Sequence, residues 1–451
     1  MGLQNKIGTE SNAIELNGNF RMALKLLENT SQNVFITGKA GTGKSTLLEY
    51  FRSITEKNIA VLAPTGVAAL NVKGQTIHSF FHFKPDITPD TVKRAYNASI
   101  YKALDTIIID EISMVRADLL DCIDRFMRLS GRDSTLPFGG VQMIFIGDLY
   151  QLSPVVTEAE QEIFNGPYKS QYFFDSYSFN ELKFEFVELT KHYRQKDKAF
   201  IELLNAIRNN SATDAHLNDL NRRFNPSFFP KDSDMYITLT TTNKLADIIN
   251  DINLSKIPRI SCTYAASITG EFNKNFLPAD ENLVLKEGAQ VMLLNNDINK
   301  RWVNGSIGKV IRMEEEDLDG SIVIRLIDGS EVHVEPYTWE LFKFFYDNIT
   351  KRLSSNKMGS FRQYPMMLSW AVTIHKSQGK TFDHVVIDIG SGTFAHGQLY
   401  VALSRCTTLD GIVLKKRVEK RHILTDVRIV NFLKKYEDAS KMSLDDSLKA
   451  L

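Results

Sequence analysis

Apolar runs and helical patterns alternate along the first part of the chain. Four short runs have the composition of buried parallel strands, namely VFIT (34–37), IAVLA (59–63), TIIID (106–110) and MIFIG (143–147). Each run leads into polar turn residues or a helical pattern, and ADLLDCIDRFMRL (117–129) carries apolar residues at helical spacing. This alternation predicts a doubly wound α/β domain.

A second alternating pattern follows and is interrupted by sequence of a different kind. Its predicted strands are FVELT (186–190), MYITLT (235–240) and HVVIDI (384–389), and its predicted helices are AFIELLNAIRN (199–209) and NKLADIINDINLSKI (243–257). Residues 284–335 instead contain the short strand patterns VMLL, IGKVIRM, SIVIRLI and EVHVE, joined by hairpin signals such as IDGS. We therefore expect a small β-barrel inserted into a second α/β domain.

The composition narrows the class of protein. A chain of 451 residues is too long for one compact core. The formal net charge is zero, so binding to nucleic acid would need cations gathered in a groove. The three scattered cysteines favour a reducing compartment, and the sequence contains no apolar run long enough to span a membrane. We expect a protein of the bacterial cytoplasm, associated with the nucleoid, with a nucleus as the alternative.

The stretch GKAGTGKST (38–46) follows the first predicted strand and precedes a helical pattern. It matches the phosphate-binding pattern G-x-x-x-x-G-K-[ST] in full. Its glycines let successive N–H groups face one anion, Lys44 would reach the β- and γ-phosphates of ATP, and the Ser45 hydroxyl would bind Mg²⁺. The predicted nucleotide-binding residues of this loop are Gly38, Ala40, Gly41, Thr42, Gly43, Lys44, Ser45 and Thr46.

Polar side chains also follow two other predicted strands. Asp110 and Glu111 end the run that begins at Thr106, at the edge where open α/β sheets bind ligands. Asp110 can hold Mg²⁺ through water, and Glu111 can orient and deprotonate the attacking water, which predicts a hydrolase rather than a kinase. Gln151, in GDLYQLSP (147–154), has an amide that can sense a γ-phosphate or position water.

Several stretches, taken in order, resemble one family. They are GKAGTGKST, APTGVAALNVKGQTIHSFF (63–81), IDEISMV (109–115), PFGG (137–140), GDLYQLSP, LTKHYRQ (189–195), TIHKSQGKTF (373–382) and YVALSRC (400–406). Together they resemble superfamily 1 helicases of the 5′-to-3′ branch, and most closely the petite-integration-frequency (Pif) helicases, relatives of RecD. The resemblance extends from about residue 30 to residue 410.

The resemblance implies an α/β fold of two RecA-like P-loop NTPase domains with ATP between them, a small projection from the first domain, and an SH3-like β-barrel inserted in the second. The implied boundaries are 1–63 and 86–188 for the first domain, 64–85 for the projection, 189–294 and 366–435 for the second domain, 295–365 for the barrel, and 436–451 for a polar tail.

Arg194 in KHYRQ and Arg405 in ALSRC match the two arginine fingers of this family. A guanidinium supplied by a facing domain stabilises the charge of a γ-phosphate in transfer only when the cleft closes, which ties hydrolysis to closure. Gly379 and Lys380, in SQGKT, are also expected on the nucleotide side.

Hydroxyls, amides and small residues can bind a phosphate backbone without reading sequence. On the resemblance, the predicted DNA-binding residues are Pro64, Thr65, Lys73, Thr76, His78, Asn243, Lys244, Thr373, His375 and Lys376. Phe80, Phe81 and Phe83 could stack on bases, although packing in the core is the favoured interpretation. Trp302, in NKRWVNGS, could contact the strand or pack inside the barrel.

The resemblance implies an ATP-dependent DNA helicase that moves 5′-to-3′ on single-stranded DNA and unwinds duplex, forked or G-quadruplex DNA, with roles in DNA repair, recombination and telomere maintenance. We expect a monomer in the absence of DNA. Two alternatives stay open: an ATPase or translocase that does not separate strands, and a nucleic-acid-binding module with an inactive nucleotide site. The intact set of nucleotide-site residues argues against the second.

Overall fold

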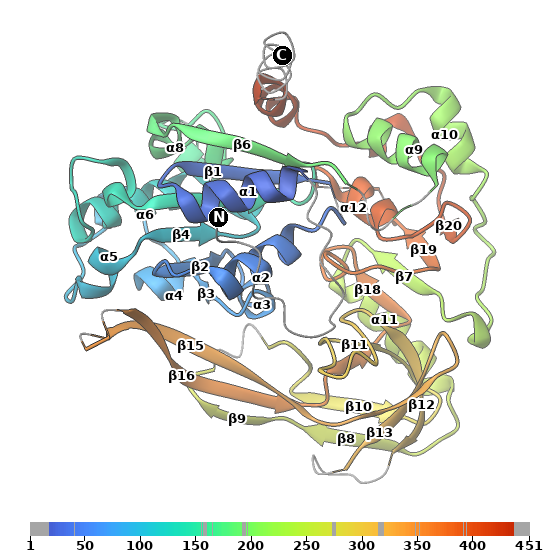
Figure 1. The fold of residues 1–451 in the computed structure, drawn as a ribbon. Helices are drawn as coiled ribbons and strands as arrows, with labels where there is room; N and C mark the ends of the chain where they lie inside the picture. Colours follow the sequence, from blue (N-terminus) through green and yellow to red (C-terminus); the bar gives the residue numbers. More distant parts are fainter. Residues whose placement is uncertain are drawn as a thin grey trace.

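The computed structural model describes residues 18–436 apart from 40, 155, 157–159, 165, 192–194, 196, 273–276, 314–319, 348, 351, 391 and 394. Two α/β lobes lie side by side, and antiparallel strands lie beneath them in the view of Figure 1. Ala40, Arg194 and nearly all of the predicted polar tail fall outside the described residues.

The first lobe is built on a six-stranded parallel sheet. Its strand order is β3-β2-β4-β5-β1-β6. The strands are β1 (Asn33–Gly38), β2 (Ile59–Ala63), β3 (Gln75–Thr76), β4 (Thr106–Ile109), β5 (Gln142–Gly147) and β6 (Phe184–Leu189). The helices are α1 (Gly18–Asn29), α2 (Lys44–Ile54), α3 (Gly66–Asn71), α4 (Ile77–Phe81), α5 (Ser99–Ala103), α6 (Ala117–Ser130), α7 (Gln161–Phe164) and α8 (Tyr177–Glu181). All four strands predicted in this part of the chain are confirmed.

Both faces of this sheet are covered, as its continuous apolar strands predict. Val34 and Ile36 of β1 pack with the apolar sides of α1 and α2 in one buried cluster. Phe35, between them in sequence, points to the opposite face and joins a cluster that includes α6 and α8. The alternation of side chains along one strand therefore places a helical layer on each face.

The predicted strand at 186–190 belongs to a different sheet from the one expected. The apolar pattern grouped it with the second α/β pattern, although the boundary implied by the resemblance placed residues up to 188 in the first domain. Strand β6 pairs in parallel with β1 at the edge of the first sheet, with Phe186 opposite Phe35. The rings of these two residues lie 5.7 Å apart. The order of elements along the chain does not reveal which sheet an edge strand joins.

The second lobe contains a four-stranded parallel sheet in the order β18-β7-β19-β20. The strands are β7 (Ile237–Thr240), β18 (Ala371–Thr373), β19 (Val385–Asp388) and β20 (Ile412–Leu414). The helices are α9 (Lys198–Arg208), α10 (Asp214–Asn221), α11 (Asn243–Lys256) and α12 (Gln398–Ser404). The predicted strands at 235–240 and 384–389 and both predicted helices are confirmed, whereas the short strands β18 and β20 were not predicted.

Antiparallel strands fill the chain between α11 and β18, which we call the insert (residues 261–368). Its three sheets have the orders β14-β13-β12-β11-β17, β10-β8 and β15-β16-β9. The strands are β8 (Ser261–Ala265), β9 (Ser267–Gly270), β10 (Asn282–Lys286), β11 (Gln290–Leu293), β12 (Ile307–Met313), β13 (Ile322–Leu326), β14 (Glu331–Val334), β15 (Tyr337–Asp347), β16 (Arg352–Gln363) and β17 (Met366–Leu368). The four short strands predicted within 284–335 are confirmed. The long β15–β16 hairpin was not predicted.

Trp302 lies in the buried core of the insert, with 6% of its surface exposed. Its indole nitrogen donates a hydrogen bond to the side-chain oxygen of Asn295 at 3.0 Å. Of the two interpretations of this tryptophan, the structure supports packing inside the insert.

The chain finally returns from the second lobe to the first. Residues 427–436 are helical. Phe432 stacks on Phe174 of the first lobe with ring centroids 4.5 Å apart, and Tyr436 stacks on Phe186 of β6 at 5.6 Å. Figure 1 shows this last helix next to α8 and β6. The two lobes are thus joined both where the chain passes between them and through this returning segment.

Candidate active site

The phosphate-binding pattern forms a tight loop between β1 and α2. Gly41 and Gly43 have φ values of 78° and 90°, which other residues adopt only with strain. Helix α2 begins at Lys44. The Lys44 ammonium donates hydrogen bonds to the carbonyl oxygens of Gly38 at 2.6 Å and Lys39 at 3.2 Å. The loop therefore directs its lysine and the positive end of a helix to one point.

Three acids surround the ammonium of Lys44. Burial lowers the pKa of Lys44, while the nearby Asp148, Glu111 and Asp110 act in the opposite direction. Burial is also the main cause that raises the pKa values of Asp110 and Glu111, and Lys44 opposes both shifts. The site therefore holds several ionisable groups that water does not screen.

Glu111 follows β4 in an unusual backbone conformation. Its φ of 51° and ψ of 44° lie in the left-handed region, which costs free energy for a residue with a side chain. The turn directs Asp110 and Glu111 to the carboxyl edge of the sheet, near the phosphate-binding loop, as the sequence predicted. Strained backbone at this place is typical of a functional site.

Gln151 is held by the loop that follows β5. Its amide nitrogen donates to Asp148 at 2.9 Å, and the backbone N–H of Tyr150 donates to the same carboxylate at 3.2 Å. Asp148 is almost completely buried and also pairs with Arg208 of the second lobe at 3.5 Å. Sequence reasoning missed Asp148 and Arg208, although Asp148 lies inside the stretch that was singled out.

Gln378 of the second lobe contacts this group of first-lobe side chains. Its amide nitrogen donates to a carboxylate oxygen of Glu111 and to the side-chain oxygen of Gln151, both at 3.2 Å. Sequence reasoning also missed Gln378, which directly precedes the predicted Gly379 and Lys380. Glu111, predicted to deprotonate water, and Gln151, predicted to sense the γ-phosphate or position water, therefore contact the same residue of the facing lobe.

Arg405 is fully buried in the second lobe, with 1% of its surface exposed. Its guanidinium donates to the carbonyl of Val401 at 3.0 Å and to the hydroxyl of Ser404 at 2.9 Å. Burial raises the pKa of Glu111, and the charge of Arg405 offsets a small part of that rise. Arg194 lies outside the described residues, but its neighbour Gln195 donates to the carbonyl of Ser404 at 3.0 Å.

The two predicted residues beyond Gln378 differ in their surroundings. Gly379 has a φ of 79°, in the left-handed region. The Lys380 ammonium donates a hydrogen bond to the side chain of Asn304 in the insert. Burial lowers the pKa of this lysine to about 8. Lys380 therefore connects the second lobe to the insert.

The oxygens of Ser45 and Asp110 suit Mg²⁺, which prefers hard oxygen ligands. Ser45 is exposed at the start of α2, and Asp110 lies at the end of β4. Among the described residues, no group of three or more His, Cys, Asp and Glu side chains could form a metal cage. A Mg²⁺ held by a hydroxyl, a carboxylate, phosphates and water needs no such cage, so the donor set fits.

The predicted DNA-binding residues fall into two groups, one on each lobe. Thr65 and Thr76 cap α3 and α4 by accepting from backbone N–H groups, both at 3.2 Å. Thr76 and His78 also line a groove of about 670 Å³ against the β15–β16 hairpin. Lys73 is exposed, and Pro64 is half-buried. Phe80 and Phe81 are core residues, which confirms the favoured interpretation of these aromatics.

On the second lobe, the predicted DNA-binding residues lie at the ends of two adjacent strands. Strand β18 ends at Thr373, which is paired with Thr240 at the end of β7. His375 and Lys376 follow β18, and burial lowers the pKa of His375. Asn243 and Lys244 are exposed at the start of α11, directly after β7.

These features define a P-loop protein of two α/β lobes, with phosphate-binding and acidic groups on the first lobe and contacts to them from the second. Two family models match the chain: the PIF1-like helicase over residues 16–217 and the UvrD-like helicase C-terminal domain over residues 368–412. The chain belongs to the PIF1-like helicase family, which confirms the resemblance drawn from the sequence.

Individual relatives agree. The chain is 32% identical to the ATP-dependent DNA helicase Pif1 of Bdellovibrio bacteriovorus, covering 94% of this chain and 93% of that protein. It is also 32% identical to human ATP-dependent DNA helicase PIF1 over 92% of this chain, but that match spans 63% of the human protein.

Solved structures of Bacteroides Pif1, 37% identical, also align. The complex with ADP-AlF4 gives a TM-score of 0.87, covering 94% of this chain and 98% of that one. The unliganded form gives 0.86, covering 94% and 97%. The form bound to ssDNA gives 0.66, covering 95% and 98%. The present arrangement is therefore closer to the unliganded relative than to its DNA-bound form. Among the described helices, none is long and apolar enough to cross a membrane.

Proposed function

We propose that this protein is an ATP-dependent DNA helicase that hydrolyses ATP between its two lobes and uses the cycle to move along single-stranded DNA. The observation that carries the proposal is the contact of Gln378 with both Glu111 and Gln151 across the cleft. The DNA helicases among its relatives support the choice of nucleic acid.

The first lobe supplies most of the chemistry. The backbone and Lys44 of the phosphate-binding loop hold the β- and γ-phosphates. Ser45 and Asp110 would hold Mg²⁺, which neutralises phosphate charge when bound. Glu111 accepts the proton of the attacking water, and Gln151 orients that water.

The second lobe supplies positive charge. Arg405, together with Arg194, stabilises the charge that develops on the γ-phosphate. Arg405 hydrogen-bonds the carbonyls of Ser377 and Lys380 at 3.4 Å, long contacts that are weak enough to be exchanged. Hydrolysis then requires the lobes to approach. Gly379 and Lys380 belong to the same nucleotide-facing turn in this proposal.

Movement along DNA follows from two grips. Pro64, Thr65, Lys73, Thr76 and His78 hold the strand on the first lobe, and a second set holds it on the other lobe. That second set is Asn243, Lys244, Thr373, His375 and Lys376. If the grips alternate in strength as the cleft opens and closes, the strand moves in one direction. The proposed direction is 5′-to-3′, a property carried by the family resemblance.

The finer features of the proposal also rest on the resemblance. They are the boundaries of the two RecA-like domains and of the projection at 64–85, an SH3-like closure of the barrel at 295–365, unwinding of forked and G-quadruplex DNA, and a monomer in the absence of DNA. A Bacteroides structure concerns unwinding at forked dsDNA by two coordinating Pif1 helicases. We therefore expect the number of copies to depend on the DNA substrate.

The test is strand separation on duplexes with a 5′ or a 3′ single-stranded tail, with ATP and Mg²⁺. Separation that needs the 5′ tail supports the proposal. Hydrolysis stimulated by single-stranded DNA without separation would favour a translocase or ATPase switch. Binding to DNA without any hydrolysis would favour a module with an inactive nucleotide site.

A further inference from the structure

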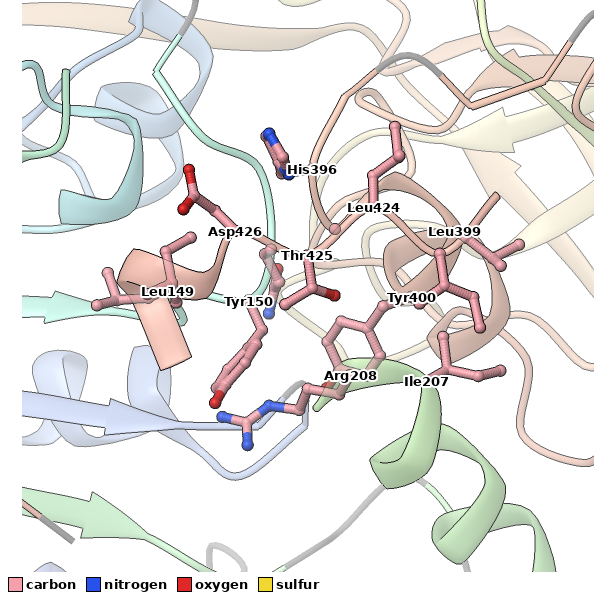
Figure 2. Close-up of a pocket in the computed structure, with 14 residues that line it drawn as sticks. Leu149, Tyr150, Ile207, Arg208, His396, Leu399, Tyr400, Leu424, Thr425 and Asp426 are labelled. Atoms are coloured by element: carbon pink, nitrogen blue, oxygen red, sulfur yellow. The ribbon is translucent and has the colours of Figure 1, made fainter. Parts of the chain in front are cut away.

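Arg208, at the end of α9 in the second lobe, crosses to the first lobe. Its guanidinium lies 3.5 Å from Asp148 and 4.0 Å from the centre of the Tyr150 ring. Figure 2 shows the guanidinium beside that ring. The two charged side chains are 4% and 1% exposed, so the pair is buried between the lobes. A buried pair of this kind adds little net stability, and here it links α9 of the second lobe to the loop that follows β5 of the first.

Asp148 also contacts Gln151. The amide nitrogen of Gln151 donates to Asp148, and its amide oxygen accepts from Gln378. Both ends of the Gln151 amide are therefore fixed, one by a carboxylate that Arg208 holds and the other by the facing lobe. A side-chain amide with a donor contact and an acceptor contact has one preferred orientation.

Gln378 belongs to the same tight turn as three of the proposed DNA-binding residues of the second lobe, namely Thr373, His375 and Lys376. The backbone N–H of Gln378 donates to the carbonyl of His375 at 3.1 Å, and Ser377 donates in the same way to Thr373 at 3.1 Å. A phosphate bound at Thr373 or His375 would therefore act on a turn that also carries the amide touching Glu111 and Gln151. A single turn therefore connects the proposed DNA-binding residues to the residues proposed to hydrolyse ATP.

We propose that Gln378 and Arg208 are positioning residues of the second lobe, which orient Gln151 and so let bound single-stranded DNA stimulate hydrolysis. This inference rests on the proposed helicase function. Neither residue needs to touch the nucleotide. Arg208 acts through Asp148, and Gln378 acts directly on the two side chains of the first lobe.

The alternative is that both residues only hold the lobes together. A purely structural role would lower stability and reduce hydrolysis equally with and without DNA. A positioning role predicts an unequal loss: the rate at saturating ATP falls by a larger factor in the presence of DNA than in its absence, whereas the KM for ATP changes little. The ratio of the two rates therefore separates these alternatives.

The experiment measures steady-state ATP hydrolysis with and without single-stranded oligonucleotide for wild type, Gln378→Ala, Gln151→Ala and the double variant. We expect Gln378→Ala to reduce the DNA-stimulated rate by about tenfold or more. Because the two residues act as one unit, we expect the double variant to be no slower than Gln151→Ala. Gln290→Ala is the matched control, since the amide of Gln290 bonds the carbonyls of Tyr236 and Ser369 and lies away from the site.

Arg208→Lys and Arg208→Met test the second positioning residue, Arg208. Lysine keeps the charge that holds Asp148, so it should retain more of the stimulation than methionine. If Gln378→Ala unfolds, Gln378→Asn, which keeps a shorter amide, replaces it. The unfolding midpoint of every variant is recorded.

The outcomes separate the two proposals. Stimulation that is unchanged in Gln378→Ala, or losses that multiply in the double variant, would overturn the positioning role while leaving the helicase proposal intact. A wild-type protein that neither hydrolyses ATP with DNA nor separates strands would instead overturn the proposed function itself.

Discussion

The side-chain oxygen of Asn58 accepts a hydrogen bond from the backbone nitrogen of Leu353 at 3.0 Å, which ties the β15–β16 hairpin to the first lobe. Gln75 makes a second such link to the carbonyl of Phe342 at 2.7 Å. The docked hairpin forms one side of the groove that Thr76 and His78 line. The hairpin therefore lies over residues that we propose to bind DNA.

Asn58→Ala removes one of these links without changing a proposed DNA-binding residue. Because the hairpin forms one side of the groove that Thr76 and His78 line, we expect it to leave this position when DNA binds there. Loss of one hydrogen bond of about 1 kcal/mol should then raise the affinity for single-stranded DNA by about fivefold. Fluorescence anisotropy with a labelled oligonucleotide measures the change.

The control for that measurement is Asn253→Ala, because the amide of Asn253 bonds only the carbonyl of Ile249 within α11 among the contacts described. Its affinity should match that of the wild type. An equal or lower affinity in Asn58→Ala would show that the docked hairpin does not oppose DNA binding.

Lys44→Ala should abolish ATP hydrolysis with little effect on the fold. The ammonium is the group of the phosphate-binding loop that can neutralise the β- and γ-phosphates, and its two hydrogen bonds are to carbonyls of the same loop. We expect the DNA-stimulated rate to fall by about a hundredfold or more. Lys25→Ala, an exposed change on α1, is the control and should leave the rate unchanged. A surviving rate in Lys44→Ala would contradict the assignment of the loop.

The parts of the site that could be predicted from the sequence lie within single short stretches. Lys44 follows a glycine-rich turn, and Asp110 follows an apolar strand, so a local pattern places each of them at the carboxyl edge of a sheet. The contacts of Gln378 with Glu111 and of Arg208 with Asp148 join distant parts of the chain. Periodicity describes one segment at a time and does not specify which loops of two lobes meet.

The fold shows the same division. The longer buried strands β1, β2, β4 and β5 are continuous apolar runs and were predicted, whereas the buried strands β18 and β20, of three residues each, were too short to be recognised. Strand β16, with the sequence RLSSNKMGSFRQ, is largely exposed over its first half and is paired through its backbone to β15. Backbone pairing leaves little trace in the sequence when one or both faces meet water, so the long hairpin was missed.

The pH dependence of stability should change when Lys380 is replaced by methionine. Burial lowers the pKa of Lys380 from 10.5 to about 8. Between these pH values the unfolded chain binds more protons than the folded one, so raising the pH favours the folded wild type. Relative to Lys380→Met, the free energy of unfolding of the wild type should rise by on the order of 1–3 kcal/mol between about pH 8 and pH 10.5. Below about pH 8 the folded wild type keeps the charged ammonium buried, and its destabilisation relative to Lys380→Met is complete.

Unfolding midpoints of the two proteins at pH 7 and pH 10 measure this change. Lys376→Met, which removes an exposed lysine from the same turn, is the control and should show the same pH dependence as the wild type. A difference between wild type and Lys380→Met that stays constant with pH would contradict the buried-ammonium interpretation.

Phe432→Ala should loosen the connection between the lobes. Phe432 belongs to the returning helix of residues 427–436 and stacks on Phe174 of the first lobe, with the two ring planes only 12° apart. Because Phe432 is half-buried, we expect the free energy of unfolding to fall by about 1–3 kcal/mol. The thermal unfolding midpoint should fall by several degrees. Limited proteolysis should cut the chain after the second lobe more rapidly. Lys434→Ala changes an exposed residue of the same helix and should leave both measurements unchanged. If Phe432→Ala matched that control, the returning segment would not hold the lobes together, and the path through Gln378 and Arg208 would bear more of the coupling between them.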